Sequence, residues 1–474
     1  MATLHALSRP GTAGAIDALK ARFGDHLQTG EAIRQQHGAT EGLADPLPPD
    51  AVLYARSTDD VAAAVRICAE NCFPVIAHGA GTSLEGQLSA VEGGLSIDLT
   101  ALDRILEINA ADLDVQVEAG VTREGLNVAL RDHGLFFPLD PGANATLGGM
   151  AATRASGTNA VRYGTMREVT LGLTVVTAAG DVIKTGTRAR KSAAGYDLTR
   201  LYVGSEGTLG IITELRLRVF GIPEQIASAS VQFDDLGDAV QAVMLVMQMG
   251  VPLARIELLD ALQMEACIRY SNLAEFAPRP TLFLEFHGSP AAVAEQVETL
   301  RAVVAEHGGG AMQFATLTED RNRLWKARHN AWFAAKALRP GAYAFATDAC
   351  VPISRLAEAI AETRADIEAA GLLAPLVGHV GDGNFHMLLL FDADNATERA
   401  TADRLAHAIA LRAIRMGGTA TGEHGIGLHK LSTLEAEHGA GALAVMASIK
   451  AALDPLNILN PGKTVPLHQP GRLD

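Results

Sequence analysis

The sequence is short of cysteine and of basic residues, and each shortage excludes a class of protein. Four cysteines in 474 residues are too few for a disulfide scaffold, so buried free thiols are the favoured interpretation. Lysine and arginine number 39 against 54 aspartates and glutamates, and the net charge is −15. Nucleic acids and anionic membranes both require a basic face on their partner, so neither is expected as the main ligand of this chain.

Long hydrophobic runs are also missing. No segment reaches the roughly 18 consecutive apolar residues that a membrane span requires. Residues 1–24 lack the apolar core of a signal peptide. These absences predict a protein of a reducing compartment, and we expect it in the cytoplasm, either free or peripheral to the inner membrane.

Apolar side chains and glycine are abundant. Hydrophobic residues make up 48% of the sequence, glycine occurs 47 times, and the length favours two or three domains. Residues 1–222 contain several short predicted strands, of which 211–219 alternates between apolar and charged side chains. Gly221-Ile222-Pro223 marks the predicted domain boundary.

Residues 223–430 follow a different pattern. A strand–helix–strand unit occurs twice between residues 230 and 316, and this order is typical of a ferredoxin-like α+β domain. The spacing of apolar residues predicts one long helix over 318–338 and another over 396–416. Residues 431–474 are expected to form a C-terminal helical segment with an irregular end.

A strand predicted over 74–78 runs into the motif HGAGTSLEG at residues 78–86. Its glycines expose consecutive backbone N–H groups with little side-chain obstruction, an arrangement that suits a pyrophosphate. The motif is not the dinucleotide fingerprint, because Leu84 occupies the third glycine position and no helix pattern follows. From these residues alone, a tight structural turn and a phosphate site are about equally favoured.

A second glycine-rich stretch covers residues 138–164. Its side chains are so small that we predict an irregular segment whose backbone packs against a large planar ligand. A merely flexible loop is less favoured, because the stretch lies between strands of one domain. The motif GSEGTLGI at 204–211 has the same character.

Two motifs bring histidines and a carboxylate into glycine-flanked positions. His379 and His386 would point to opposite faces of an unbroken strand, but the intervening Gly381-Asp382-Gly383-Asn384 supplies a turn that can bring both together. Glu423 and His424 are adjacent in TGEHGIG. Two histidines and a glutamate suffice for a divalent metal with open positions. A metallohydrolase built on these ligands is one hypothesis, but it would leave the glycine-rich segments without a purpose.

Trp325, Arg328 and Trp332 have the spacing of one helix face. An arginine placed between two tryptophans could grip a substrate carboxylate through two hydrogen bonds. An arginine stacked on tryptophan as ordinary packing is equally favoured by the spacing.

Several long motifs resemble, in order, those of FAD-linked oxidases of the vanillyl-alcohol-oxidase fold: PVIAHGAGTSLEG, PLDPGANATLGG, GSEGTLGIITE, GHVGDGNFH, TGEHGIG and LDPLNILNPGK. More narrowly, ARHNAWFAA, TDACVPISRL and the two histidine motifs are similar to those of cytochrome-type D-lactate dehydrogenases. Glycolate oxidase flavoprotein subunits and D-2-hydroxyglutarate dehydrogenases are relatives of that group. The resemblance extends over nearly all of residues 45–466.

The resemblance implies an α+β fold with a division of labour. Residues 1–222 would form a two-subdomain, PCMH-type FAD-binding domain with an N-terminal helical segment. Residues 223–430 would form a ferredoxin-like substrate (cap) domain, and 431–474 would return to the FAD domain. The implied FAD-binding residues are Gly79, Ala80, Gly81, Thr82, Ser83, Gly86, Pro141, Gly142, Thr146, Gly149, Ser156, Asn159, Glu206 and Ile211. The implied ligands of a divalent metal, Zn²⁺ or Mn²⁺, are His379, His386 and Glu423.

The implied activity is oxidation of a D-2-hydroxy acid, D-lactate first, to the 2-oxo acid with hydride transfer to FAD N5. Arg328 and Trp332 would contact the substrate, the metal would polarise its hydroxyl, and His424 would take the hydroxyl proton. Electrons would pass to a cytochrome c, a quinone or an electron-transfer protein, and a homodimer is allowed. The alternatives are a glycolate or D-2-hydroxyglutarate dehydrogenase, or an FAD-binding subunit of a multi-subunit glycolate oxidase.

The cap also suggests a limit on substrate size. In D-2-hydroxyglutarate dehydrogenases, a basic residue in the strand before the VPISRL-like segment meets the second carboxylate of the substrate. The matching position here is Ala346. The resemblance therefore predicts good oxidation of D-lactate and poor oxidation of D-2-hydroxyglutarate.

Overall fold

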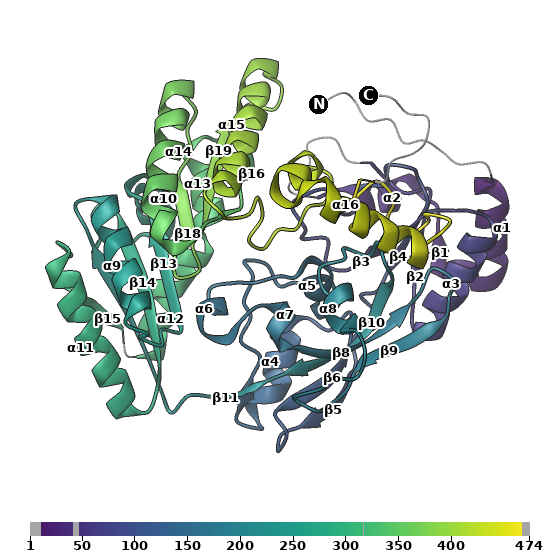
Figure 1. The fold of residues 1–474 in the computed structure, drawn as a ribbon, viewed down its shortest axis with the longest axis horizontal. Coiled ribbons are helices and arrows are strands. Elements are labelled where there is room, and N and C mark those ends of the chain that lie inside the picture. Colours follow the sequence, from purple (N-terminus) through teal and green to yellow (C-terminus); the bar gives the residue numbers. More distant parts are fainter. Residues whose placement is uncertain (1–10, 41–46, 316, 467–474) are drawn as a thin grey trace. The chain divides into compact units, whose positions relative to one another are not determined.

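The computed structural model describes residues 11–40, 47–315 and 317–466. Contacts between residues divide the chain into two units. Figure 1 labels their helices and strands. Unit 1 comprises Met1–Ser156, Thr165–Gly221 and Glu423–Asp474, and unit 2 comprises Gly157–Gly164 and Ile222–Gly422. The chain therefore leaves unit 1 twice and returns to it twice.

Unit 1 contains two sheets and a short ribbon. The first sheet has the order β1 (Leu27–Gln28), β2 (Ala51–Tyr54), β4 (Leu95–Asp98), β3 (Val75–His78), in which β2, β4 and β3 are parallel. The second is antiparallel, in the order β5 (Ile105–Asn109), β6 (Asp114–Glu118), β10 (Ile211–Arg218), β8 (Thr170–Val176), β9 (Val182–Gly186). The ribbon pairs β7 (Leu135–Phe136) with β11 (Phe220–Gly221).

Sequence pattern explains these strands. In β10, Leu215 and Leu217 are buried while Glu214 and Arg216 are half-buried, so the predicted alternation is confirmed. The parallel strands are almost continuously buried, as expected of strands covered on both faces. The helices of unit 1 are α1 (Thr12–Phe23), α2 (Glu31–Gly38), α3 (Thr58–Glu70), α4 (Arg123–Arg131), α5 (Leu147–Thr153), α7 (Met166–Val169), α8 (Leu198–Tyr202) and α16 (Leu434–Leu453).

The glycine-rich stretch 138–164 is not the irregular segment that its composition predicts. It contains α5 in unit 1 and α6 (Ala160–Tyr163) in unit 2. Leu147 and Met150 of α5 are buried in the core of unit 1, and Gly148 packs so closely on Ala119 that an added Cβ would lie 2.6 Å from the Cβ of that residue. Its small residues therefore serve close packing within the chain as well as access for a ligand.

The C-terminal segment completes the parallel sheet. The backbone of Val75 in β3 donates to the carbonyl of Ile458 (2.7 Å) and accepts from the N–H of Asn460 (2.8 Å). The ammonium group of buried Lys450 in α16 donates to the carbonyls of Thr208 and Leu459, both at 2.8 Å. Residues far apart in sequence thus close one edge of this sheet.

Unit 2 is built on one sheet with the order β15 (Gln313–Ala315), β12 (Gln225–Gln232), β14 (Thr281–Gly288), β13 (Arg255–Leu259), β18 (Leu376–His379), β19 (Asn384–Phe391), β16 (Tyr343–Ala346). The first four strands are antiparallel and have the order of the ferredoxin-like unit, fourth–first–third–second. The predicted ferredoxin-like order is confirmed, and three further strands extend the sheet. The short β17 (Ala349–Cys350) also pairs with β19.

Helices cover both faces of this sheet. One face packs on α9 (Leu236–Gln248), α11 (Pro290–Glu306), α14 (Leu356–Ala370) and α15 (Ala396–Arg415). The opposite face packs on α10 (Ala261–Ser271), α12 (Thr318–His329) and α13 (Ala331–Leu338). Strand residues alternate between the two: Leu282 and Leu284 contact the first set and Phe283 the second.

The predicted single helix over 318–338 is wrong in one respect. It is two helices, α12 and α13, separated at Asn330, where ψ is 2°. Asparagine favours such helix ends because its side chain competes for backbone hydrogen bonds. Trp325 and Trp332 therefore lie on different helices and do not share one helix face.

The four cysteines form no disulfide, as expected. Cys68 and Cys267 are buried and Cys350 is half-buried, but Cys72 is exposed because α3 ends before it, at Glu70. Among the helices of the described residues, none combines the length and the apolar composition needed to cross a bilayer.

Candidate functional site

The motif that follows β3 forms a cradle of backbone in unit 1. An added Cβ at Gly79 would collide with the hydroxyl oxygen of Thr146, and Gly81 has a φ of +73°, which favours glycine. The hydroxyl of Ser83 is buried and has no hydrogen-bond partner among the described residues. Ala80 and Thr82 are both exposed, so the loop offers main-chain groups with few obstructing side chains.

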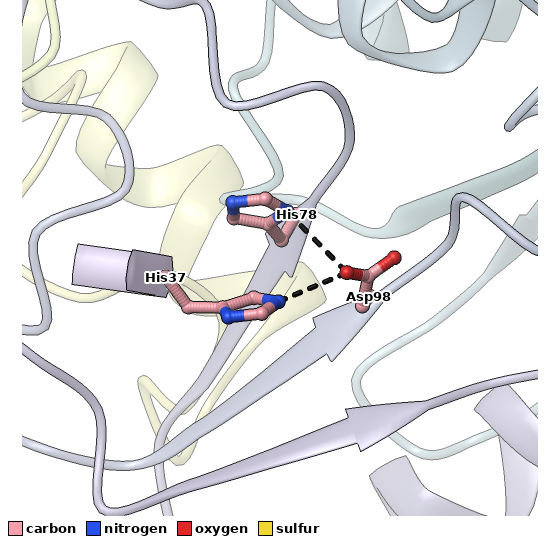
Figure 2. A group of neighbouring side chains, drawn as sticks. All are labelled: His37, His78 and Asp98. Carbon is pink, nitrogen blue, oxygen red and sulfur yellow. Dashed lines mark hydrogen bonds and ion pairs between the residues drawn. The ribbon is translucent and has the colours of Figure 1, made fainter. Parts of the chain in front are cut away.

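His78, which ends β3 just before this loop, belongs to a cluster of three buried side chains with His37 and Asp98 (Figure 2). His37 Nδ1 donates to the carbonyl of Ile33 at 2.9 Å, and its Nε2 lies 2.9 Å from Asp98 Oδ2. The ring of His78 lies 4.4 Å from that of His37 and contacts the position of Gly81, where an added Cβ would be 3.4 Å from His78 Nε2. Because both nitrogens of His37 face acceptors, its ring must be protonated to satisfy both.

The two histidines of this cluster have opposite pKa shifts. Burial lowers the pKa of His37, but the hydrogen bond to Asp98 and the bond to Ile33 outweigh burial, and its pKa is raised. Burial and the neighbouring His37 charge lower the pKa of His78 to about 4. As the pH falls, His37 is therefore protonated before His78.

Glu206, which the resemblance implies for FAD, accepts hydrogen bonds within unit 1. Its carboxylate accepts from the backbone N–H groups of Ile426 (2.7 Å) and Gly427 (2.9 Å) and from the hydroxyl of Thr464 (2.7 Å). Burial raises the pKa of Glu206, and these donors only partly offset it. The carboxylate thus fixes the segment that contains His424.

Glu85, in the same motif as the cradle, is the centre of a charged cluster. Its fully buried carboxylate lies 2.8 Å from the ammonium of Lys430, 3.3 Å from His429 Nδ1 and 3.4 Å from His424 Nδ1. Burial would raise the pKa of Glu85, but Lys430 and the two histidines hold it well below its usual range. Glu85 and Glu206 together fold the TGEHGIG segment and thereby place His424.

The remaining implied FAD residues fall into both units. Pro141 and Gly149 are half-buried, Gly142 is exposed and Thr146 is buried, ahead of α5. Gly86 has a φ of +77° and packs on Leu428, and Ile211 begins β10. Ser156 ends the first segment of unit 1, whereas buried Asn159 belongs to unit 2.

In unit 2, the β18–β19 hairpin brings two histidines to one face of the sheet. Val377 of β18 is paired with His386 of β19, so His379, two residues further along, points to the same face as His386. The two ring centroids are 5.4 Å apart. The turn predicted between these histidines is present and has the expected effect.

Both histidines are held by acceptors at Nδ1. His379 Nδ1 donates to Glu257 Oε1 at 2.7 Å, and His386 Nδ1 donates to the carbonyl of Thr347 at 2.8 Å. With Nδ1 fixed by these acceptors, Nε2 is the nitrogen of each ring that would bind a metal ion. The donor set fits a divalent metal, and Glu423, the third predicted ligand, is the first residue of the last segment of unit 1.

Arg328 does not stack between the tryptophans, which is one of the two interpretations that the spacing leaves open. Its Nε and Nη2 donate to Glu257 Oε2 at 2.9 and 2.5 Å. The guanidinium that stacks on Trp325 belongs to Arg255, 4.6 Å from the ring centroid, and Trp325 Nε1 donates to the hydroxyl of Ser228 at 3.0 Å.

Trp332 and Ala346 belong to the apolar cluster on the face of the unit 2 sheet that packs on α10, α12 and α13. Trp332 is half-buried against the cluster that also contains Ala346, which is 8% exposed. The indole Nε1 of Trp332 is buried without a hydrogen-bond partner among the described side chains.

Models of two domain families match the chain. "FAD binding domain" matches residues 49–186, and "FAD linked oxidases, C-terminal domain" matches 222–464, which is more than half of the chain. This chain belongs to the FAD-linked oxidase family.

Relatives of this FAD-linked oxidase match almost its full length. It is 49% identical over 458 residues to the "Probable D-lactate dehydrogenase, mitochondrial" of Danio rerio, with 96% of this chain and 92% of that protein covered. It is 43% identical over 455 residues to the "D-lactate dehydrogenase [cytochrome], mitochondrial" of Arabidopsis thaliana, with 96% and 80% covered. The solved structure of p-cresol methylhydroxylase with substrate bound has a TM-score of 0.79 at 18% identity, with 97% of each chain covered. The vanillyl-alcohol-oxidase type of fold is thereby confirmed.

The cradle of this FAD-linked oxidase fits the expected cofactor. The loop after β3 exposes backbone groups at Gly79–Ser83, and the buried hydroxyl of Ser83 has no hydrogen-bond partner within the described parts of the chain. FAD is the cofactor of the matching domain family, so the FAD prediction is confirmed at that level. Sequence reasoning missed Glu257, Glu85 and Asp98, because an isolated carboxylate has no local pattern; its partners lie tens to hundreds of residues away.

Proposed function

We propose that this FAD-linked oxidase oxidises D-lactate to pyruvate. The observation that carries the proposal is the arrangement on one face of the unit 2 sheet, where Arg328, His379 and His386 are held by buried acceptors. The two relatives of nearly full length, both of which have D-lactate dehydrogenase in their names, support it further. FAD, when bound, accepts the hydride from C2 of the substrate.

Arg328 would bind the carboxylate of the substrate. A guanidinium carries five N–H groups, and Glu257 accepts from only two of them. The remaining hydrogens on Nη1 and Nη2 can form a bidentate pair with a carboxylate. His424 would accept the hydroxyl proton at Nε2, because Glu85 lies against its Nδ1.

We further propose that His379, His386 and Glu423 hold a divalent metal, Zn²⁺ or Mn²⁺. Such an ion would polarise the C2 hydroxyl and lower its pKa. Both histidines present Nε2, which is the pattern of ligands whose other nitrogen is fixed by an outer acceptor.

The physiological electron acceptor and the cellular location of the chain are also proposed. We propose a cytochrome c as acceptor, with a quinone or an electron-transfer protein as alternatives, and a cytoplasmic chain that can associate with the inner membrane. A homodimer is compatible with this arrangement. Cell fractionation with an antibody against this chain tests the location.

The central test is anaerobic reduction of the purified FAD-loaded protein. D-lactate, L-lactate, glycolate and D-2-hydroxyglutarate are added separately, and loss of the oxidised flavin absorbance is recorded. D-lactate should bleach the flavin fastest, and added cytochrome c should restore the absorbance. Faster bleaching by glycolate or by the diacid would contradict the substrate assignment.

A further inference from the structure

Glu257 is a buried carboxylate that lies outside the glycine-rich, histidine and tryptophan motifs of the sequence. It lies on β13 with no solvent exposure, on the sheet face that packs on α10, α12 and α13. Its neighbours Ile256 and Leu258 point to the opposite face. A charge in this position is costly unless it is fully paired.

Its two oxygens have different partners. Oε2 accepts from Nε and Nη2 of Arg328, and Oε1 accepts from Nδ1 of His379. The sheet itself fixes the second contact: β13 and β18 pair Leu258 with Gly378, and the same register places Glu257 opposite His379. Arg328 reaches this point from α12, 71 residues further along the chain.

We propose that Glu257 is a positioning residue that couples the metal ligand His379 to the substrate-binding Arg328. This inference rests on the proposed function. By accepting from Nδ1, the carboxylate directs Nε2 of His379 to the metal and increases its basicity. By accepting from Arg328, it fixes the plane of the guanidinium that would meet the substrate carboxylate. One side chain thus sets the positions of both groups.

The chain offers a matched control in Glu285, the neighbouring carboxylate on β14. Glu285 lies on the same face, is 6% exposed, and lies 2.8 Å from His287 and 3.5 Å from Arg255. None of the bonds of Glu285 goes to His379 or Arg328 in the described structure. Replacing either glutamate removes one buried charge from one face of one sheet.

The experiment compares Glu257→Gln with Glu285→Gln in the FAD-loaded protein. Affinities for Zn²⁺ and for Mn²⁺ are measured by competition with a chelator, FAD content by absorbance, and kcat and KM with D-lactate. Glutamine keeps one acceptor oxygen and loses the other, so E257Q should weaken metal binding 10- to 100-fold. It should also raise KM several-fold at unchanged FAD content, whereas E285Q should alter neither value.

Glu257→Asp provides the second variant if E257Q fails to fold. Aspartate keeps the charge but is one methylene too short to reach both partners, so metal affinity should again fall. Unchanged metal affinity and KM in a folded Glu257 variant would overturn the inference, as would a wild-type protein that binds neither metal. A wild-type protein that binds metal but does not oxidise D-lactate would instead overturn the proposed function. In that case, weaker metal binding by E257Q than by E285Q would still support the positioning of His379 by Glu257.

Discussion

The two units prepare their ligand sites by different means. Unit 1 exposes the backbone of the glycine-rich cradle Gly79–Ser83, and Glu206 is buried among neutral donors that fix neighbouring loops. Unit 2 exposes side chains: Glu257 is buried between a guanidinium and an imidazole. The pKa values of these two carboxylates differ, because burial raises that of Glu206, whereas for Glu257 the interactions with His379 and Arg328 outweigh burial and lower it. Whether the pKa of a buried carboxylate rises or falls thus depends on the charge of its partners.

The largest effect is expected where the backbone of unit 1 is altered. Gly81→Asp would place a negative charge in the cradle proposed for the pyrophosphate, and FAD should be lost from the purified protein. Gly81→Asn is the matched control, because asparagine has the same size and tolerates positive φ but is neutral. FAD content by absorbance distinguishes the two. Full FAD in a folded G81D protein would refute the pyrophosphate assignment.

A substitution at the proposed metal site of unit 2 should leave FAD bound. His386→Ala removes one proposed metal ligand, so metal content should fall below 10% of wild type and turnover should be lost while FAD stays bound. Elemental analysis and absorbance on the same sample measure both. His407→Ala, a change in α15 outside the proposed ligands, provides the control. Undiminished metal in H386A would exclude this ligand.

The choice between substrates tests the apolar residues on the face of the unit 2 sheet that packs on α10, α12 and α13. Ala346 and Trp332 cannot neutralise a second carboxylate, and burying one unpaired costs several kcal/mol. We expect kcat/KM for D-2-hydroxyglutarate to be at least about 100-fold below that for D-lactate, because each 1.4 kcal/mol is a factor of ten. Ala346→Arg should narrow the gap. A wild-type preference for the diacid would contradict this assignment.

The smallest expected effect is a pH dependence of the stability of unit 1. The pKa of His78 is about 4 in the folded chain against an ordinary 6.5, so the folded state binds fewer protons than the unfolded state between these values. Stability should therefore fall as the pH decreases from 6.5 to 4, by at most about 3 kcal/mol. His37, with its raised pKa, acts in the opposite direction and loses its contribution as pH rises above 6.5.

Thermal midpoints of wild type and His78→Phe between pH 4.5 and 7 check this prediction. The phenylalanine variant should lose less of its midpoint on acidification than the wild type. Parallel slopes for both proteins would show that His78 is not the group responsible.

Sequence patterns predicted most of the local structure and part of the candidate site. The alternation in β10, the ferredoxin-like order and the turn between His379 and His386 follow from local periodicity and glycine placement. The break at Asn330 did not, because a single residue in an otherwise helical pattern carries little signal. Glu257 was missed for a different reason: its partners lie 71 and 122 residues away, and only the sheet register brings them together.

The return of Ile458 and Asn460 to the edge of β3 has a consequence for synthesis of the chain. All of unit 2 has been made once Gly422 has been translated, whereas unit 1 begins first and still lacks the segment that covers β3. During translation the edge of β3 stays exposed until residues 458–460 leave the ribosome. Synthesis of unit 1 therefore begins before that of unit 2 and ends after it. A ribosome stalled shortly before residue 458 would hold a chain in which all of unit 2 has been made but the β3 edge of the unit 1 sheet is still uncovered.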